Sequence, residues 1–240
     1  NLMNRPTFRP HEAVRAMRRL HDDPDKTEEA FTIVRVIDGG GIDRLHHRFT
    51  STPEGRRLLA ERPSVLAALR DRAALAAMPE GSLGRAYLAY CEREGVDAGG
   101  LVDASASDER EELDEERRYI AERMRDTHDL YHVVTGCRTD LAGELGVLAF
   151  TTAQTGSLGT GFLVAAGYLH SYALPESGGA GRRMAREMFS RGLRARALPT
   201  APWEQLLSRP LDEVRVELGI TSVPVYQPFY KTDRDAALAA

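Results

Sequence analysis

The chain has 240 residues, of which 42% are apolar and 28% charged, an ordinary composition for a protein that can bury a sizeable core. Its formal net charge of −4 excludes the strong positive field of a general nucleic-acid binder, so nucleic acid is not an expected partner. The two cysteines, Cys91 and Cys137, form no CxxC motif and no disulfide framework, which fits a reducing cytoplasm. The polar N-terminal segment NLMNRPTFRP lacks the pattern of a signal peptide.

Helical periodicity predicts an all-α fold. Apolar spacing and Gly or Pro stop signals place helices or short helical pieces at residues 11–23, 26–41, 51–81 and 82–95. A loop rich in Gly, Asp and Ser follows at 96–107, and one long helix is expected from about residue 108 to Gly136. Thr139 or Asp140 caps the next helix, a basic helix covers 178–198, and two short helices opened by proline cover 202–220. No strand pattern or repeat appears, so residues 1–240 are expected to form a single domain.

Residues 145–175 contain no Asp, Glu, Lys or Arg, which raises the question of a membrane span. The stretch also holds several threonines, a glutamine, a histidine and many glycines, and its mean hydropathy is low for a span. A helix that is apolar all round must be covered by something, so a buried helix in the core is the preferred prediction.

Two histidines and a carboxylate form the candidate site. His128 and His132 are four residues apart, so they project from one face of a helix and can hold one metal ion. Asp129 lies about 100° further round that helix. The short turn GCRTD lets the following helix fold back and return Glu144 to the level of both histidines. Nitrogen and oxygen ligands without thiolate suit zinc, iron(II), manganese or cobalt.

The alternative is an ordinary amphipathic helix, because two histidines at this spacing are weak evidence alone. Glu144 argues against that alternative. It stands at the mouth of the uncharged stretch, where a carboxylate needs a partner. The four residues therefore predict a divalent metal site with room for water or substrate.

The pattern HDxxH followed by eleven residues and Glu144 resembles the signature of the Coq4 family of ubiquinone-biosynthesis proteins. Three further segments are similar to that family and keep its order: PEGSLGRAYLAY (79–90), LAGELGVLAFTTAQTG (141–156) and WEQLLSRPLDEVRVELGI (203–220). The resemblance covers much of residues 79–220 and is least distinctive in the N-terminal third.

The resemblance implies an all-helical domain whose metal is held by His128, Asp129, His132 and Glu144. Zinc is the usual metal, with iron, manganese, cobalt or magnesium as alternatives. The implied activity is oxidative decarboxylation of a polyprenylated hydroxybenzoate, in which a hydroxyl replaces the C1 carboxylate. Implied partners are the isoprenoid lipid, a membrane surface and other ubiquinone-biosynthesis proteins, and a homo-oligomer is allowed. The expected location is cytoplasmic, on the inner face of a bacterial-type membrane.

Two further segments suit a lipid partner, although each has a structural alternative. The small residues Gly156, Gly159, Gly161, Ala165, Ala166 and Gly167 would leave a groove for a prenyl tail, or would allow close helix packing. The arginines of the basic helix would bind an anionic bilayer, or would form a solvated face. They are Arg182, Arg183, Arg186, Arg191, Arg194 and Arg196. Arg85 and Tyr87 are candidates for binding an anionic group, and an exposed helix arginine is the alternative.

Three hypotheses remain open at this stage. The first is the metal-dependent decarboxylase, and the second is a lipid-binding scaffold that organises other ubiquinone enzymes. The third is an HD-type phosphohydrolase, suggested by His128-Asp129. That class needs a further upstream His and a downstream Asp, and Glu144 fits it poorly. The adjacent pair His46-His47 cannot face one direction on a helix, and His11, His21 and His170 are given no role.

Overall fold

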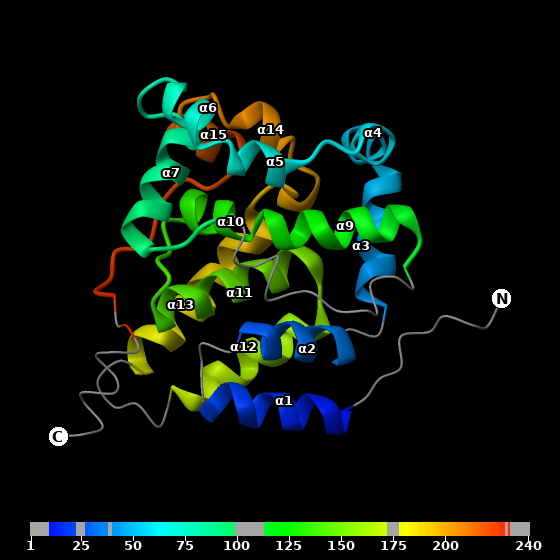
Figure 1. The fold of residues 1–240 in the computed structure, drawn as a ribbon. Helices are drawn as coiled ribbons and strands as arrows, with labels where there is room; N and C mark the ends of the chain where they lie inside the picture. Colours follow the sequence, from blue (N-terminus) through cyan, green and yellow to red (C-terminus); the bar gives the residue numbers. More distant parts are fainter. Residues whose placement is uncertain are drawn as a thin grey trace.

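The computed structural model describes residues 10–22, 27–37, 40–98, 113–171, 178–228 and 230. Within those ranges the chain is helical without a strand, apart from an isolated bridge between Ser82 and Pro210, which confirms the all-α prediction (Figure 1). The elements are α1 (Pro10–Asp22), α2 (Thr27–Ile37), α3 (Gly41–Ser51), α4 (Pro53–Glu61), α5 (Val65–Arg70), α6 (Arg72–Ala77), α7 (Leu83–Glu94), α9 (Glu115–Asp126), α10 (His128–Thr135), α11 (Leu141–Thr155), α12 (Leu158–His170), α13 (Gly178–Arg194), η2 (Leu198–Thr200), α14 (Trp203–Leu206) and α15 (Leu211–Glu217).

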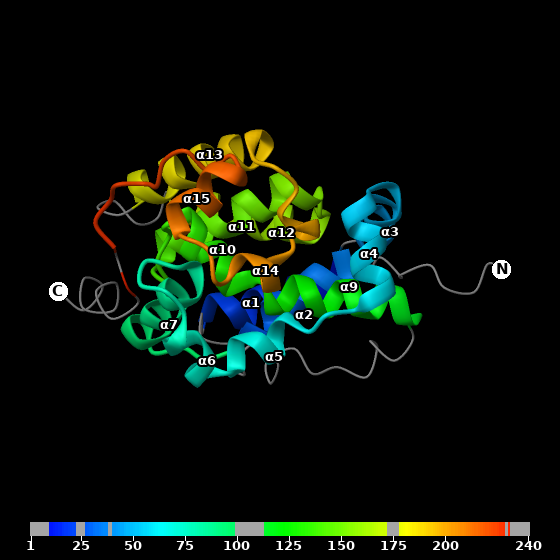
Figure 2. The same cartoon turned by 90° about the horizontal axis from the view of Figure 1, so that it is seen from above.

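The main core surrounds α10 and α11. Helix α11 packs along α13, and α10 packs against α7, so the centre of the molecule is closed on several sides (Figures 1 and 2). Tyr131, Phe150 and Trp203 are fully buried there. The ring centroid of Tyr131 lies 6.1 Å from that of Phe150 and 6.0 Å from that of Trp203. Large aromatic side chains supply much of the apolar area that such a core removes from water. The two helices that carry the candidate site, α10 and α11, are therefore held in place by a well-packed core.

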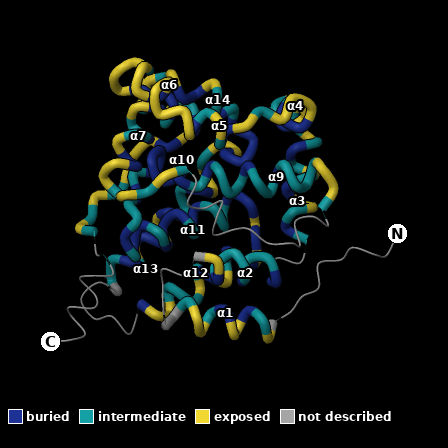
Figure 3. The backbone as a smooth tube through the Cα atoms, viewed as in Figure 1, coloured by how far each residue is buried: buried dark blue, intermediate teal, exposed yellow. Residues whose placement is uncertain are grey.

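Two smaller clusters flank this core. Helices α1, α2 and α12 form a layer at one end, around Ala16, Ile33 and Leu163. Helices α3, α4 and α9 form the other cluster, around Phe49 and Leu58. Figure 3 shows buried residues running through the centre, with exposed residues on the outer turns of α1, α4 and α6. Helix α3 was not predicted from the sequence.

The uncharged stretch differs from the prediction because it forms two helices, α11 and α12. Gly156 separates them at φ 66°, a left-handed conformation that ends a helix and that glycine adopts at little cost. Ser157 then caps α12 by accepting a hydrogen bond from the Thr160 amide at 3.2 Å. None of the described helices is both long and apolar enough to cross a bilayer.

The predicted long helix is also two helices, α9 and α10. Thr127 lies between them, and its hydroxyl donates to the Arg123 carbonyl at 2.8 Å. Such back-bonding competes with the regular helix ladder and bends it. The proposed start at residues 108–112 and most of the expected loop at 96–107 lie outside the described residues. Pro202 and Pro210 occupy the N-cap positions of α14 and α15, one residue before the predicted place.

Candidate metal centre

A five-residue turn brings the two helices of the site together. Gly136 ends α10 at φ 74°, where a side chain would be strained, and its amide donates to the His132 carbonyl at 2.9 Å. Asp140 begins α11 by accepting a hydrogen bond from the Ala142 amide at 3.2 Å. Both predicted end signals are thus present. The turn returns the first turn of α11 to the face of α10 that carries the histidines.

His128, His132 and Glu144 converge. The two Nε2 atoms lie 3.2 Å apart, His132 Nε2 is 3.3 Å from one Glu144 oxygen, and His128 Nε2 is 3.7 Å from the other. For a zinc ion held tetrahedrally at about 2.1 Å, two ligand atoms lie about 3.4 Å apart. Among the described residues, these three form the one group whose ligand atoms suit a shared cation. The spacing therefore fits a metal without rearrangement of the helices.

The protonation of His132 also fits a metal ligand. Its Nδ1 lies 3.1 Å from the Cys137 carbonyl oxygen, which can only accept a hydrogen bond. Nδ1 therefore carries the proton, and in the neutral ring the Nε2 lone pair points toward His128 and Glu144. A backbone carbonyl on the far nitrogen is the usual partner of a metal-binding histidine, because it fixes the tautomer and the orientation of the ring.

The charges at the site support each other. Burial disfavours the charged form of Glu144, yet the imidazoles of His132 and His128 hold the pKa of this carboxyl well below its usual range. Burial likewise opposes protonation of His132, but the Glu144 carboxylate raises its pKa overall. The side chain of Glu144 is 40% exposed while that of His132 is 1% exposed. The carboxylate therefore stays ionised and is open to solvent on one side.

Asp129 is the predicted ligand that the structure does not bring into this group. It is buried in the first turn of α10, and burial raises the pKa of its carboxyl although His128 and His132 lower it. Its negative charge raises the pKa of Tyr90 on α7, after the larger effect of burial. Asp129 is thus an acidic group beside the cluster. Its role as a metal ligand stays a prediction.

Sequence reasoning missed the residues that brace the turn. Glu94 accepts hydrogen bonds from Arg138 Nε at 3.0 Å and from Thr139 Oγ1 at 2.7 Å, so the end of α7 is tied to the turn. Burial opposes its charge, but Arg93, Thr139 and Arg138 together lower the pKa of Glu94 to about 2. No local pattern marks such contacts, because the partners are about 45 residues apart in the chain.

The C-terminal segment braces the same turn from the other side. Tyr226 Oη donates to Asp140 Oδ1 at 2.6 Å and accepts from the Arg138 amide at 3.0 Å. A Cβ added to Gly143 would lie 2.1 Å from the Arg138 carbonyl oxygen and 2.6 Å from Tyr226 Oη. A glycine is therefore required at this position, directly before Glu144, by the closeness of the turn and of the C-terminal segment.

Comparison with known proteins gives the family. The model of the family described as "Coenzyme Q (ubiquinone) biosynthesis protein Coq4" matches residues 16–224, which include the whole cluster. This chain belongs to the Coq4 family. The chain is 34% identical over 192 residues to a protein of Talaromyces stipitatus, a match that covers 76% of this chain and 61% of that protein. That relative is named "Ubiquinone biosynthesis protein coq4, mitochondrial".

Other Coq4 relatives agree. A protein of Pyricularia oryzae with the same description is 31% identical over 199 residues, covering 81% of this chain and 62% of that protein. The matched region thus spans about three fifths of these curated relatives. A solved structure from Nostoc punctiforme, named as a candidate ubiquinone biosynthesis protein, superposes with a TM-score of 0.69 at 24% identity. It covers 90% of this chain and 100% of that one, and at this identity it confirms the fold.

A cavity of about 520 Å³ in this Coq4 chain is lined in part by α11, the helix that carries Glu144, although none of the three converging side chains lines it. The first turn of α11 contributes Leu141, Ala142 and Leu145, so the cavity adjoins the turn that carries Glu144. The remaining walls come from the end of α12, the start of α13 and the C-terminal segment, through residues that include Gly167, His170, Met184 and residues 224–228. His170, which was given no role from the sequence, is part of this lining.

The small residues of α12 serve packing more than the cavity. A Cβ on Gly159 would lie 2.4 Å from the Val34 Cα, so this glycine lets α12 approach α2 closely. Gly156 ends α11, and Gly161 faces Thr152 of the same hairpin. Of the six small residues that the sequence singled out, Gly167 is the one that lines the cavity. Close helix packing therefore accounts for Gly159, and the structure does not favour either alternative for all six residues.

The basic helix α13 is mainly a core helix. Met184 and Met188 are buried on the side packed against α11, as the alternative of a solvated arginine face requires, whereas Phe189 and Leu193 are exposed. Arg182 donates to the Ser171 carbonyl at 2.9 Å, which ties α13 to the end of α12. Arg85 in α7 is exposed and donates to the Ala76 carbonyl at 2.6 Å, whereas Tyr87 is buried.

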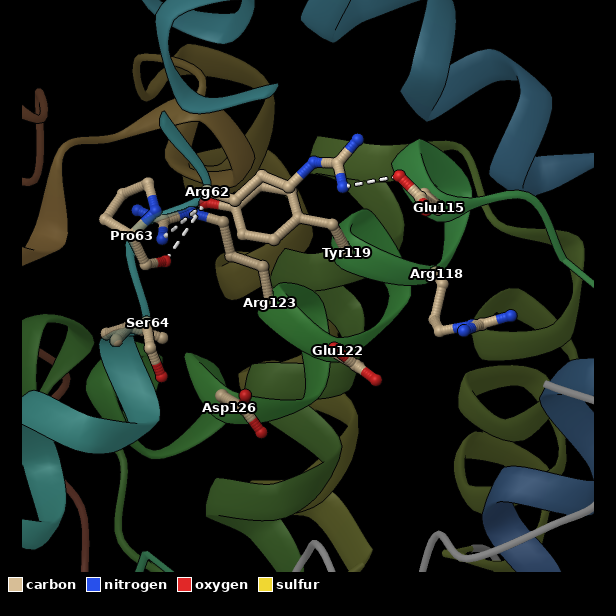
Figure 4. Close-up of a pocket in the computed structure, with 10 residues that line it drawn as sticks. Arg62, Pro63, Ser64, Glu115, Arg118, Tyr119, Glu122, Arg123 and Asp126 are labelled. Carbon is tan, nitrogen blue, oxygen red and sulfur yellow. Dashed lines mark hydrogen bonds and ion pairs between the residues drawn. The ribbon is translucent and has the colours of Figure 1, made fainter. Parts of the chain in front are cut away.

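A second cavity, of about 410 Å³, lies along α9 and contains none of the predicted site residues (Figure 4). Its side chains carry both charges, and Figure 4 shows the ion pair between Arg62 and Glu115 at 2.8 Å. Arg123 at its base pairs with Glu204, with Nη1 to Oε1 at 2.7 Å. Arg62, Glu115 and Arg123 in this cavity are therefore each paired with an opposite charge, whereas His128, His132 and Glu144 form a group that suits a shared cation.

Proposed function

We propose that this chain acts in ubiquinone biosynthesis as a metal-dependent enzyme. The reaction is oxidative decarboxylation of a polyprenylated hydroxybenzoate, which releases the C1 carboxylate as carbon dioxide and leaves a hydroxyl on the ring. The observation that carries the proposal is the convergence of His128, His132 and Glu144, whose ligand atoms all lie within 4.8 Å of one another, with the first turn of α11 also lining a cavity. Membership of the Coq4 family supports the pathway.

Each residue of the site has a separate role in this proposal. His128 Nε2, His132 Nε2 and a Glu144 oxygen would hold the ion, and Asp129 would supply a fourth ligand or a nearby negative charge. The ion, zinc or one of its alternatives, would bind the substrate carboxylate and stabilise the negative charge that develops on the ring as the C–C bond breaks. The Cys137 carbonyl keeps the His132 ring in its binding tautomer. Because the replacement is an oxidation, dioxygen or another electron acceptor must take part.

The neighbouring cavity suits the prenyl tail. Its walls include Leu141, Leu145 and Met184, and apolar walls favour an isoprenoid because burying its surface releases it from water. Arg183 and Glu187 on α13 lie at the same cavity and would leave a polar mouth. A tail seated there would place the aromatic head near the first turn of α11, where Glu144 lies.

A membrane surface is the proposed source of this lipid. Helix α12 exposes Leu158, Phe162 and Leu169 along one face, with fractional exposures of 59%, 37% and 67%, and has no charged residue. Helices with an apolar face can lie in the interface of a bilayer. Location at the inner face of a bacterial-type membrane remains a prediction, and the curated relatives are named as mitochondrial.

The same apolar face is also the observation that favours the second candidate function. A protein that binds the quinone precursor at a membrane and presents it to other enzymes would need the cavity and the exposed face of α12, but no turnover of its own. Exposed apolar patches commonly mark interaction sites. Under this alternative the metal would capture the carboxylate of the lipid.

Glu144→Gln tests the proposal. The amide keeps the size of the side chain but removes its charge, and loss of a ligand is expected to lower metal affinity by about 100-fold or more, since even outer-shell changes cost 10–100-fold. Glu92→Gln is the matched control, because that carboxylate is exposed on α7 and lies outside both the cluster and the cavity lining. Elemental analysis reports bound metal, and mass spectrometry of a prenylated hydroxybenzoate reports turnover.

The outcomes separate the two candidates. Loss of metal and turnover in Glu144→Gln, with both retained in Glu92→Gln, supports the enzyme. If Glu144→Gln loses the metal yet still supports quinone production in cells that lack their own family member, the enzyme is excluded and the scaffold remains. Release of phosphate from a prenyl phosphate or nucleotide would instead favour a phosphohydrolase.

A further inference from the structure

Tyr90 on α7 is in direct contact with the cluster, and the proposed function gives it no task. Its ring stacks on the imidazole of His132, with ring centroids 5.8 Å apart and an interplanar angle of 25°. The residue is 2% exposed, so it closes one side of the site. Stacking of this kind needs only an aromatic ring, and phenylalanine would provide it equally well.

The hydroxyl of Tyr90 has no hydrogen-bond partner among the described residues. It is buried, and no described residue lies within hydrogen-bond distance of Oη. Leaving such a group without a partner costs about 1–3 kcal/mol. The ring of Tyr90 stacks on His132, which belongs to the His128–His132–Glu144 cluster. Burial raises the pKa of this hydroxyl most, and the group is close enough to the site for the charges of Asp129 and Glu144 to raise that pKa further. A buried donor near candidate metal ligands is suited to a ligand that arrives with its own acceptor.

We propose that Tyr90 Oη donates a hydrogen bond to a carboxylate or phenolate oxygen of an aromatic acid bound at the His128–His132–Glu144 cluster, and so orients its ring. This inference rests on the proposed function, because it takes the hydroxybenzoate as the ligand. Tyr90 is a positioning and specificity residue in this arrangement. A site that offers a buried donor rejects ligands without a matching acceptor, since the donor would then be left unpaired.

Tyr131 provides a matched control within the same chain. Its hydroxyl is also buried without a described partner, but its ring packs between Phe150 and Trp203, at centroid distances of 6.1 and 6.0 Å. Tyr131→Phe therefore removes a buried hydroxyl from the core, and Tyr90→Phe removes one from the cluster. Any general effect of deleting a buried hydroxyl is common to the two variants.

The experiment uses the full chain loaded with Co²⁺, whose visible absorption changes when its ligands change. The probe is 4-hydroxybenzoate that carries a farnesyl chain next to the hydroxyl, added in detergent. Tyr90→Phe is expected to bind Co²⁺ as tightly as wild type and the probe about tenfold more weakly, the effect of one hydrogen bond. Tyr131→Phe is expected to match wild type in both titrations, and thermal melting confirms that both variants are folded.

Each other outcome has a definite meaning. Equal affinity of Tyr90→Phe and wild type for the probe would overturn the inference and leave the proposed function standing. If Tyr90→Phe instead binds Co²⁺ itself more weakly, the hydroxyl serves the metal ligands and the inference is again wrong. If wild type binds no Co²⁺, or binds Co²⁺ but not the probe, the proposed function fails first, and the inference falls with it.

Discussion

Two polar contacts made by the α9–α10 segment differ in the charges that they bring together. In the first, Arg123 binds Glu204 through two nitrogens at 2.7 and 3.0 Å and also donates to the Ala201 carbonyl at 2.9 Å. In the second, His132 and His128 face each other through their Nε2 atoms, with Glu144 beside them. The first contact joins opposite charges. The second brings two imidazoles and a carboxylate together, and the ligand atoms of all three suit a shared cation.

This difference separates a structural contact from a candidate site. A buried charge is retained when a partner neutralises it, and Arg123 has that partner on the opposite element. At the second contact, the Nε2 atom of His132 and the Glu144 carboxylate both present lone pairs, which a proton on His128 or a shared cation can satisfy. We therefore expect changes at the first contact to alter stability and changes at the second to alter metal binding. The following variants test that separation.

Arg123→Ala is expected to have the largest effect on stability. Breaking a buried ion pair leaves Glu204 without its partner and costs about 3–5 kcal/mol. Arg62→Ala is the matched control, because its pair with Glu115 is exposed and is worth at most about 1 kcal/mol. Urea unfolding measures both, and metal content per folded molecule is expected to stay at the wild-type value.

A loss of metal from folded Arg123→Ala would contradict the separation, because it would place α9 within the binding machinery. An equal loss of stability in Arg62→Ala would show that the exposed pair and the buried pair contribute equally to stability. The expected effect of burial on the ion pair would then be wrong.

Gly143→Ala is expected to affect both stability and metal binding, because the turn and the cluster share this position. The added Cβ would meet the Arg138 carbonyl oxygen at 2.1 Å, and such overpacking costs about 1–3 kcal/mol. Gly161→Ala is the control, since its Cβ would have an ordinary contact with Thr152 at 3.4 Å, and it gains up to about 1 kcal/mol of helix propensity. Thermal unfolding and a Co²⁺ titration of both variants check this. Equal behaviour of the two alanines would refute the close approach at Gly143.

Glu94→Gln is expected to affect stability no more than Gly143→Ala does, and its effect should depend on pH. The carboxylate has a pKa lowered to about 2, so its stabilising effect is present above the unfolded pKa of about 4.5 and is lost as the pH falls toward 2. At neutral pH the variant is expected to lose about 1–3 kcal/mol, the range for hydrogen bonds to a charged group. Urea midpoints at pH 7 and pH 3 measure the difference, which should shrink at the lower pH.

Glu92→Gln on the same helix is the control, because its pair with Arg72 is exposed on both sides. It is expected to leave both midpoints near the wild-type values. A Glu94→Gln difference that stays constant from pH 7 to pH 3 would mean that the charge of Glu94 does not hold the turn.

The local part of the site was determined by the sequence itself. The spacing of His128 and His132, the left-handed glycine at 136 and the cap at Asp140 each depend on a few neighbouring residues, and all three appear as predicted. Because the turn is short, the first turn of α11 returns to the face of α10 that carries the histidines, and Glu144 lies there. The all-α fold follows in the same way, because helical periodicity and stop signals are properties of short segments.

The tertiary structure decided which side chains meet across the fold. The break at Gly156 was missed because an uncharged stretch carries no amphipathic pattern that would mark two helices. Asp129 adjoins His128 in the chain, yet it lies outside the group of converging ligand atoms. Tyr90 and Glu94 reach the site from a helix about 40 residues away. Such contacts depend on how whole helices pack, and packing sums many weak interactions that no single segment of sequence contains.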